Sequence, residues 1–522
     1  MSVYDGIRRR AFLGSALAAF PVARGAAQTA PHLWEGYDFG NPEGPGDRLD
    51  QGPFSIDQDA GWRTLATTTP STGHIRNYGL GLVGYTWEEN GPALPVRKGA
   101  QTLEAAVERM ASLPFVDVLY IRCDWRDVQS RPGRLDLNPV WELTAEAAKR
   151  HGLRIAFRVQ LSNPEFQPGE IALPAFLRDK VPLVKIGKLL RHGRDVEFVE
   201  PRYDHPEFQK AFGELNALLA ARFDGDPLVE WMDLMMYGFW GEGHTSNLPN
   251  PFPGYWTARR TFLEMTRLQL DAWKRTPLAV NTEPDISGTG NNEVLDMAVR
   301  AGCWLRSDSI VDEEPMQIEE LANRPPGLPA ILEDGSWREY DVRKIPVDGA
   351  GVNRRENAML HVLDLGANYW SLWTEAENLE EYNARYPEGF RKLQRRMGYR
   401  VRPAWVWQRK RLGAPEVIIG VANDGVAGIP GALRLTVEMP ERNFLMSGVL
   451  DAGHPHGGKV REAAFVLPAE IDGGPLRLRA EIETKGGVQR PVRWACAQSL
   501  NADGSFSIEL QKAGAVGWLK GV

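Results

Sequence analysis

The sequence has few of the residues that build several common kinds of site. Its 522 residues include three cysteines, Cys123, Cys303 and Cys496. Their wide spacing forms neither a CxxC pair nor an even-numbered disulfide framework, so we expect buried thiols. No Gly-rich nucleotide-binding turn follows the first apolar run, and no G-x-S-x-G serine elbow occurs. Lys and Arg number 61 against 68 Asp and Glu, so the chain lacks the basic field that nucleic-acid binding requires.

Apolar runs long enough to cross a membrane are also missing, although a shorter one stands near the N-terminus. Three arginines at 8–10 precede an apolar stretch at 11–23, and small residues follow at 25–27. This order is typical of a secretory signal, and Arg9-Arg10-Ala11-Phe12-Leu13 resembles the twin-arginine export motif. We therefore expect a signal peptide over residues 1–27 and a mature chain in the bacterial periplasm or outside the cell. A basic N-terminus that anchors the protein to a membrane is the alternative.

The middle of the chain alternates between short apolar runs and longer segments of helical period, which is typical of a parallel sheet covered by helices. After an irregular lead-in at 28–75, we predict a closed (β/α)₈ barrel over 76–400; an open doubly wound sheet is the alternative. The predicted strands are Leu80–Tyr85, Val116–Cys123, Arg154–Leu161, Val229–Tyr237, Leu278–Asn281, Cys303–Arg306, Ala330–Leu332 and Asn368–Leu372. The predicted helices are Thr102–Leu113, Val140–Arg150, Phe208–Phe223, Tyr255–Arg275, Glu293–Ala301 and Arg354–Leu365.

Two further regions depart from this alternation. The Pro-rich stretch at 162–206 is long enough that we expect it to shape a binding cleft. Beyond residue 400, short apolar runs are separated by Gly, Pro and Asp turns, which predicts a small antiparallel β-sandwich over 401–522. Its strands are expected at Val417–Val421, Ala432–Val437, Phe444–Leu450, Glu462–Leu467, Leu476–Glu483 and Phe506–Leu510.

Acids, arginines and tryptophans follow nearly every predicted barrel strand. In such barrels the chemistry sits at the carboxyl ends of the strands, and the 17 tryptophans favour aromatic-lined binding surfaces. One carboxylic acid and one carboxylate suffice to hydrolyse a glycosidic bond. We expect substrate binding by Trp87, Arg122, Asp124, Trp125, Arg158, Trp240, His244, Asn281, Glu283, Asp308, Trp373 and Glu375.

Two glutamates are the candidate catalytic residues. Glu242 lies in Tyr237-Gly238-Phe239-Trp240-Gly241-Glu242-Gly243-His244, where glycines allow close ligand approach and Trp240 would raise the pKa of the carboxyl. Glu333 ends the apolar run 329–332, and strand register turns only one of Glu333 and Asp334 toward the barrel axis. We predict Glu242 as general acid and base and Glu333 as nucleophile.

Residues 76–400 resemble the (β/α)₈ glycoside hydrolases of clan A. That clan carries its acid/base glutamate after strand four and its nucleophile after strand seven, so the resemblance implies these roles for Glu242 and Glu333. It also implies that Arg122 holds the nucleophile ionised and that Trp373 is an aromatic platform. The segment from Tyr203-Asp204-His205-Pro206-Glu207-Phe208 to Gly241-Glu242 resembles β-galactosidase-like barrels with a G-x-W-G-E signature. The clan has Asn before its acid/base residue, where this chain has Gly241.

The sequence therefore predicts an exported glycosidase that acts on a carbohydrate, needs no cofactor or metal, binds no nucleic acid and retains anomeric configuration. Two other functions stay open. The first is a non-catalytic carbohydrate-binding barrel. The second is a lyase acting on uronate glycans, in which Arg122, Arg158 and Arg306 would neutralise substrate carboxylates. Glu283 and Asp308 are alternative nucleophiles if the strand register differs. The sugar, its linkage and the oligomeric state are not predicted.

Overall fold

The computed structural model describes residues 63–88, 91–92, 102–163, 171–191, 194–243, 252–282, 291–307, 321–334, 354–411 and 413–512. The chain divides into two compact units, 1–37 and 38–522, and every described residue belongs to the second. The predicted signal peptide lies outside the described residues. Within them, no helix is both long and apolar enough to cross a membrane.

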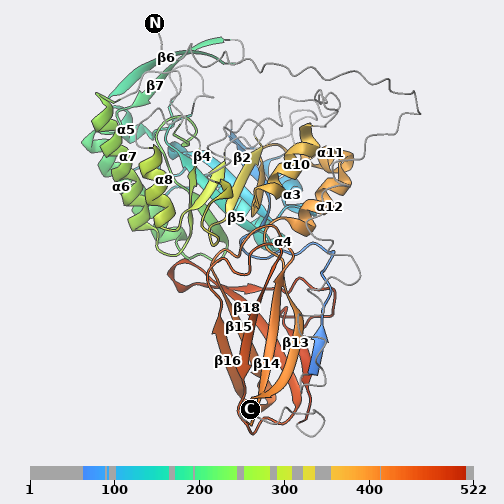
Figure 1. The fold of residues 1–522 in the computed structure, drawn as a ribbon. Coiled ribbons are helices and arrows are strands. Elements are labelled where there is room, and N and C mark those ends of the chain that lie inside the picture. Colours follow the sequence, from blue (N-terminus) through green and yellow to red (C-terminus); the bar gives the residue numbers. More distant parts are fainter. Residues whose placement is uncertain are drawn as a thin grey trace, which may run out of the picture. The chain divides into compact units, whose positions relative to one another are not determined.

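Eight parallel strands close into a barrel (Figure 1). In barrel order they are β2 (Gly81–Glu88), β4 (Val118–Asp124), β5 (Arg154–Gln160), β8 (Val229–Asp233), β9 (Leu278–Asn281), β10 (Trp304–Ser307), β11 (Ala330–Asp334) and β12 (Tyr369–Leu372). Each strand pairs in parallel with the next, and β12 pairs with β2. The predicted barrel is confirmed, and the open-sheet alternative is wrong. A short strand, β3 (Gly91–Pro92), pairs antiparallel with β2.

Helices lie outside the barrel strands, as Figure 1 shows for α6, α7 and α8. They are α3 (Leu103–Ser112), α4 (Pro139–His151), α5 (Ala175–Arg178), α6 (Pro206–Phe223), α7 (Tyr255–Ala272), α8 (Asn291–Arg300), α10 (Arg354–Asp364), α11 (Ala376–Arg385) and α12 (Pro387–Arg396). All six predicted helices are confirmed. Their ends follow local chemistry: Thr102 caps α3 by accepting from the Ala105 N–H, and Gly152 ends α4 in a left-handed conformation.

Three predictions about irregular segments need correction. The stretch 162–206 contains an antiparallel hairpin of β6 (Leu183–Arg191) and β7 (Arg194–Pro201), whose frequent charges masked its alternation. The lead-in contains β1 (Arg63–Thr67), which pairs with a strand far along the chain. The fourth barrel strand ends at Asp233 instead of Tyr237, because a tight turn begins soon afterwards.

Beyond residue 400, two antiparallel sheets pack face to face. One has the order β1, β13 (Val401–Arg411), β14 (Ala414–Asn423) and β17 (Lys459–Val466). The other has the order β16 (Phe444–Val449), β15 (Ala432–Met439), β18 (Gly474–Glu483) and β19 (Gln489–Val492), with β20 (Phe506–Leu510) also on β18. A single apolar core takes residues from both sheets, as the predicted sandwich requires. Strand β13 was not predicted, because it contains Pro403 and proline is uncommon inside strands. Pro403 lies at a bulge in this strand.

Alternate residues of each barrel strand point inward and form layers. The layer nearer the amino ends is apolar and aromatic: Val83, Tyr85, Val118, Tyr120, Ala156, Trp231, Ala279, Trp304, Ile331 and Tyr369. Two residues further along several strands, the next inward positions are charged. Many tryptophans also belong to the core: Trp125, Trp231, Trp273, Trp370, Trp405, Trp407 and Trp494 are each less than 2% exposed. Most of the described tryptophans therefore pack in the core, and aromatic-lined binding surfaces stay a prediction.

Candidate active site

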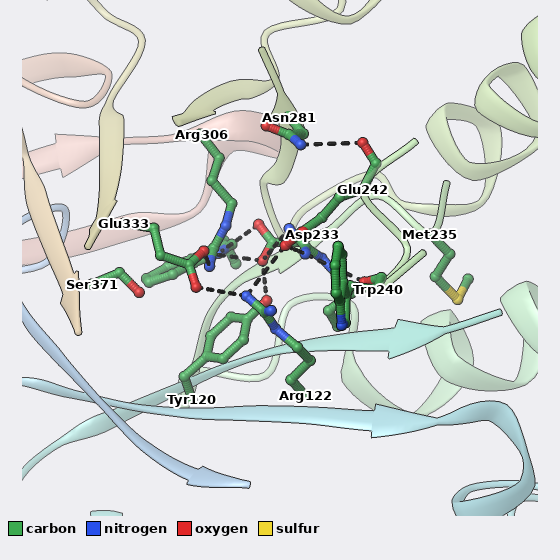
Figure 2. Close-up of polar contacts among 12 residues, drawn as sticks. Tyr120, Arg122, Asp233, Met235, Trp240, Glu242, Asn281, Arg306, Glu333 and Ser371 are labelled. Carbon is green, nitrogen blue, oxygen red and sulfur yellow. Dashed lines mark hydrogen bonds and ion pairs between the residues drawn. The ribbon is translucent and has the colours of Figure 1, made fainter. Parts of the chain in front are cut away.

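Six charged side chains meet inside the barrel at the carboxyl ends of its strands. Each is 2% exposed or less, and together they form what we name the ion cluster: Arg122, Arg158, Asp233, Glu242, Arg306 and Glu333. Figure 2 shows the labelled members pointing toward one another, joined by dashed contacts. Charges buried this deeply persist only when they are paired and hydrogen-bonded, and the three guanidinium groups balance the three carboxylates.

Glu333, on β11, points into the barrel and is held by three donors. Its Oε1 accepts from Arg122 Nη2 at 2.7 Å and from the Tyr85 hydroxyl at 2.9 Å, and Arg306 Nη2 donates to Oε2. Burial raises the pKa of Tyr85 to about 12, so its hydroxyl keeps the proton that it donates. Two guanidinium groups and a hydroxyl stabilise a negative charge on Glu333, the form in which a carboxylate attacks.

One guanidinium nitrogen joins both candidate catalytic carboxylates. Arg122 Nη2 lies 2.7 Å from Glu333 Oε1 and 3.2 Å from Glu242 Oε1. These two oxygens are therefore at most about 6 Å apart, a bound that admits the ~5–5.5 Å of retaining glycosidases and lies below the ~6.5–9.5 Å of inverting ones. Arg158 Nη1 donates to the same Glu242 oxygen. The predicted effect of Trp240 on Glu242 is opposed here, because two guanidinium contacts favour the ionised carboxylate.

Glu242 belongs to a tight turn that follows β8. Four residues of this turn adopt left-handed backbone conformations: Gly238, Trp240, Gly241 and Gly243. Only glycine adopts this region without strain, so Trp240, at φ 57°, must be held by its surroundings. A Cβ on Gly241 would lie 3.3 Å from Arg158 Cδ. The asparagine that the resembled clan carries at this position would therefore meet both a left-handed backbone and the Arg158 side chain.

Sequence analysis did not single out Asp233, which is central to the ion cluster. Its Oδ2 lies 3.2 Å from Arg306 Nη1 and 3.4 Å from Arg158 Nη2, and it accepts from the Tyr120 hydroxyl. The strand was predicted to continue to Tyr237, so Asp233 stood in the middle of an apolar run instead of at a strand end. A signal existed, because Asp233 follows the inward Trp231 by two residues, and strand alternation places both inside the barrel.

Asp124 ends β4, two residues beyond Arg122, and is 3% exposed. Its Oδ1 accepts from Gln160 Nε2 at 3.3 Å and from Asn163 Nδ2 at 3.2 Å, and Arg126 Nε lies 3.4 Å from Oδ2. Burial outweighs these contacts and raises the pKa of Asp124 to about 8. Asp124 therefore largely keeps its proton at neutral pH.

The remaining predicted residues divide between support of the turn and the core. Asn281 Nδ2 donates to the main-chain oxygen of Glu242 at 3.1 Å (Figure 2). The Trp240 ring packs with Ile186 and Phe198 of the β6–β7 hairpin.

The structure does not bring Trp125 to the ion cluster. It is fully buried, donates to Gln129 Oε1 at 2.8 Å and packs edge-on against Phe208. Trp87, on β2, is 7% exposed, and Trp373 is half-buried against the barrel core. Glu375 precedes α11 and accepts from Asn378 Nδ2 at 2.7 Å, a contact that supports the start of that helix.

Three predicted residues, His244, Glu283 and Asp308, lie outside the described residues. Across the part of the chain that is described, no group of three or more His, Cys, Asp or Glu side chains is arranged to hold a metal ion. In the ion cluster, arginine and tyrosine groups contact the carboxylates, and Asp233 Oδ1 also accepts from Trp231 Nε1 at 3.1 Å.

No protein-family model matches the chain, and no curated protein matches it. Among solved structures, the catalytic domain of β-amylase from Paenibacillus polymyxa is 11% identical, with a TM-score of 0.39 over 60% of this chain and 97% of that one. Endo-glycoceramidase II from Rhodococcus sp. is 13% identical, with a TM-score of 0.38 over 77% and 100%. A thermostable xylanase mutant from Cellvibrio japonicus is 12% identical, with a TM-score of 0.35 over 56% and 86%. Likeness this distant assigns neither substrate nor reaction.

Proposed function

We propose that this protein is a glycoside hydrolase that cleaves glycosidic bonds of an oligo- or polysaccharide with retention of configuration. The observation that carries the proposal is the contact of one Arg122 nitrogen with both Glu242 and Glu333. It holds Glu242, from the turn after the fourth strand, and Glu333, on the seventh strand, at a separation that suits attack and protonation on one glycosidic bond.

The proposed reaction has two steps. Glu333 attacks the anomeric carbon while Glu242 gives a proton to the glycosidic oxygen, so the carbon–oxygen bond breaks and a glycosyl ester forms. Glu242 then takes a proton from water, whose oxygen attacks the anomeric carbon and releases Glu333 as a carboxylate. Arg122 and Arg306 keep Glu333 ionised for attack. Because Arg158 favours the ionised form of Glu242, the bound sugar must displace that contact before Glu242 can carry its proton.

The test is a screen of chromogenic glycosides and polysaccharides, with the first-formed anomer followed by NMR. We expect the product to keep the configuration of the substrate. Glu242→Gln and Glu333→Gln should each lower kcat by at least about 10²-fold, with circular dichroism unchanged. Glu197→Gln is the matched control, because Glu197 is an exposed hairpin residue paired with Lys185. Full activity of either active-site variant, or an inverted product, would contradict the proposal.

A non-catalytic carbohydrate-binding barrel is the second candidate, favoured by the closed pairing of the ion cluster. It predicts oligosaccharide binding by calorimetry without product after long incubation. The lyase alternative lacks such support, because Arg122, Arg158 and Arg306 contact the protein's own carboxylates. Products that absorb as unsaturated sugars would nevertheless revive it.

Export through the twin-arginine pathway is part of the proposal, and the arginine pair at 9–10 with the apolar stretch at 11–23 supports it. N-terminal sequencing of protein recovered from the periplasm should begin at Gln28. Recovery of protein that retains Met1 would count against export with cleavage.

A further inference from the structure

A buried carboxylate outside the ion cluster links two segments that hold the turn of Glu242. Glu200, on β7, is 1% exposed. The Ser162 hydroxyl donates to its Oε1, and the Tyr203 hydroxyl donates to its Oε2. Ser162 follows barrel strand β5, whereas Tyr203 follows the β6–β7 hairpin and precedes α6. A single carboxylate therefore connects the end of a barrel strand with the chain that leaves the hairpin.

The two partners of Glu200 both bind the turn directly. The Tyr203 hydroxyl oxygen accepts the Gly238 N–H at 3.1 Å, and the Ser162 carbonyl oxygen accepts the Trp240 N–H at 3.0 Å. Gly238 and Trp240 are left-handed, at φ 81° and 57°. A strained conformation such as that of Trp240 persists only where surrounding contacts determine it. These two hydrogen bonds are such contacts, and each comes from a residue that Glu200 fixes.

The hairpin adds an apolar contact on the same turn. Ile186 and Phe198, from β6 and β7, form one cluster with Phe239 and Trp240. Phe198 and Phe239 lie 5.5 Å apart between ring centroids. Side chains from β6 and β7 thus hold the turn by packing, and Glu200 in the same hairpin holds it through polar contacts.

We propose that Glu200 is a positioning residue for Glu242: it fixes Ser162 and Tyr203, and through them the turn that carries Glu242 into the ion cluster. The effect of Glu200 on turnover rests on the proposed function. Its effect on the turn does not, because the hydrogen bonds exist whatever the reaction is.

The protonation state of Glu200 decides how well the contact is satisfied. An ionised carboxylate accepts from both hydroxyls, whereas a protonated one has a proton to donate where both neighbours already donate. Burial raises the pKa of Glu200 to about 7, against the opposing effect of these hydrogen bonds. Among the described residues, Tyr203 is the titratable group in contact with it, and burial holds the Tyr203 pKa well above its ordinary value. The adjacent Arg202 and Asp204 pair with each other at 2.7 Å.

The first experiment measures hydrogen exchange of the peptide 234–243 by mass spectrometry and needs no substrate. Glu200→Ala should speed exchange of the Gly238 and Trp240 amides. Glu200→Gln, which keeps the shape but can accept only one of the two hydrogen bonds, should speed this exchange less than Glu200→Ala does. Glu197→Gln, the exposed hairpin control, should change nothing. Exchange in Glu200→Ala that matches the control at 234–243 would overturn the proposal.

The second experiment measures kinetics on whichever glycoside the protein cleaves. Glu200→Ala should lower kcat about 10–100-fold, as expected when a catalytic group is misplaced, with KM nearly unchanged. In the parent protein, kcat should fall as pH drops through about 7, where Glu200 takes up its proton. Glu200→Gln, which like the protonated acid can accept from only one of the two hydroxyls, should hold kcat near the low-pH value of the parent protein and remove that acidic limb. If kcat of Glu200→Gln still falls as pH drops through about 7, Glu200 is not the group that sets this pH dependence and the positioning role is refuted.

These outcomes separate the two proposals. If the parent protein turns over no glycoside but exchange at 234–243 still depends on Glu200, the glycosidase proposal fails while the positioning of the turn stands. If turnover is found and neither exchange nor kcat responds to Glu200→Ala, the positioning proposal fails alone.

Discussion

The two ends of the same barrel bury carboxylates in different ways. At the amino ends of the strands, Glu230 meets a single guanidinium: Arg154 Nε lies 2.5 Å from Oε2, while the Gly79 N–H and the Tyr369 hydroxyl donate to Oε1. At the carboxyl ends, three carboxylates and three guanidinium groups share their contacts, and one Arg122 nitrogen serves two acids. The first arrangement is a closed pair, and the second is a crowded network.

The difference teaches what burial of charge is for at each end. Glu230, on β8, pairs with Arg154 on β5 and accepts from Gly79, ahead of β2, and from Tyr369 on β12. These contacts join the four segments, which is a structural role. Bringing three carboxylates together does not stabilise the fold in this way, because like charges repel and each carboxylate loses its hydration. Charges gathered at a cost to stability are typical of sites that carry chemistry. The comparison predicts that the two ends respond to mutation in opposite ways.

The largest effect is expected at the amino end. Arg154→Met leaves Glu230 buried without its cation, which should lower the free energy of unfolding by about 3–5 kcal/mol. Because Arg154 lies far from the ion cluster along β5, kcat of the folded fraction should stay unchanged. Urea unfolding followed by circular dichroism measures the loss. A stability loss below about 1 kcal/mol would show that this pair is not structural.

The matched change at the carboxyl end is Arg122→Met. It removes the nitrogen shared by Glu242 and Glu333 and leaves two carboxylates facing each other, so kcat should fall at least about 100-fold. Initial rates on the substrate found in the screen measure it, with the melting temperature recorded alongside. If Arg122→Met kept nearly full kcat, the carboxyl end would not differ from the amino end in carrying the chemistry.

Asp124 sharpens the comparison through pH. Its pKa is raised in the folded state, so the folded protein binds this proton more tightly than the unfolded chain does. Stability should therefore fall as pH rises from about 4 toward 8, by about 1.4 kcal/mol per pH unit at most. Asp124→Asn should remove this contribution, measured as the difference in unfolding free energy between pH 5 and 8 in parallel titrations. Asp271→Asn, at an 86% exposed position, is the control and should leave the pH dependence intact.

The smallest effect is expected in the apolar layer below Glu333. Ile331 is fully buried and stands two residues before Glu333 on β11. Ile331→Val removes one methylene group and should cost about 0.5–1.5 kcal/mol, with kcat and KM unchanged. Thermal unfolding and steady-state rates check both. A large loss of kcat would mean that the apolar layer positions the ion cluster, and the two layers would then not be separable.

The barrel strands were predictable because each is a short apolar run, and six of them are followed by a helix of clear period. Glu333 was predictable too, since it ends such a run and strand alternation assigns it the inner side. The hairpin of β6 and β7 was not, because its strands are rich in charge and pair only with each other. Asp233 and Glu200 were also missed, since neither belongs to a motif.

The sequence by itself determined the eight barrel strands, six of the helices and most strands of the C-terminal sheets, because these depend on local periodicity. It also singled out Glu242 and Glu333 as candidates, because both stand where apolar runs end. Tertiary structure alone decided which charges meet. Arg122 contacts both glutamates only because barrel closure brings residues more than a hundred positions apart within a few ångströms. Glu200 contacts Ser162, 38 positions away, because the β6–β7 hairpin folds back onto the end of β5. Pairing across such separations depends on how the strands wrap, which no local pattern encodes.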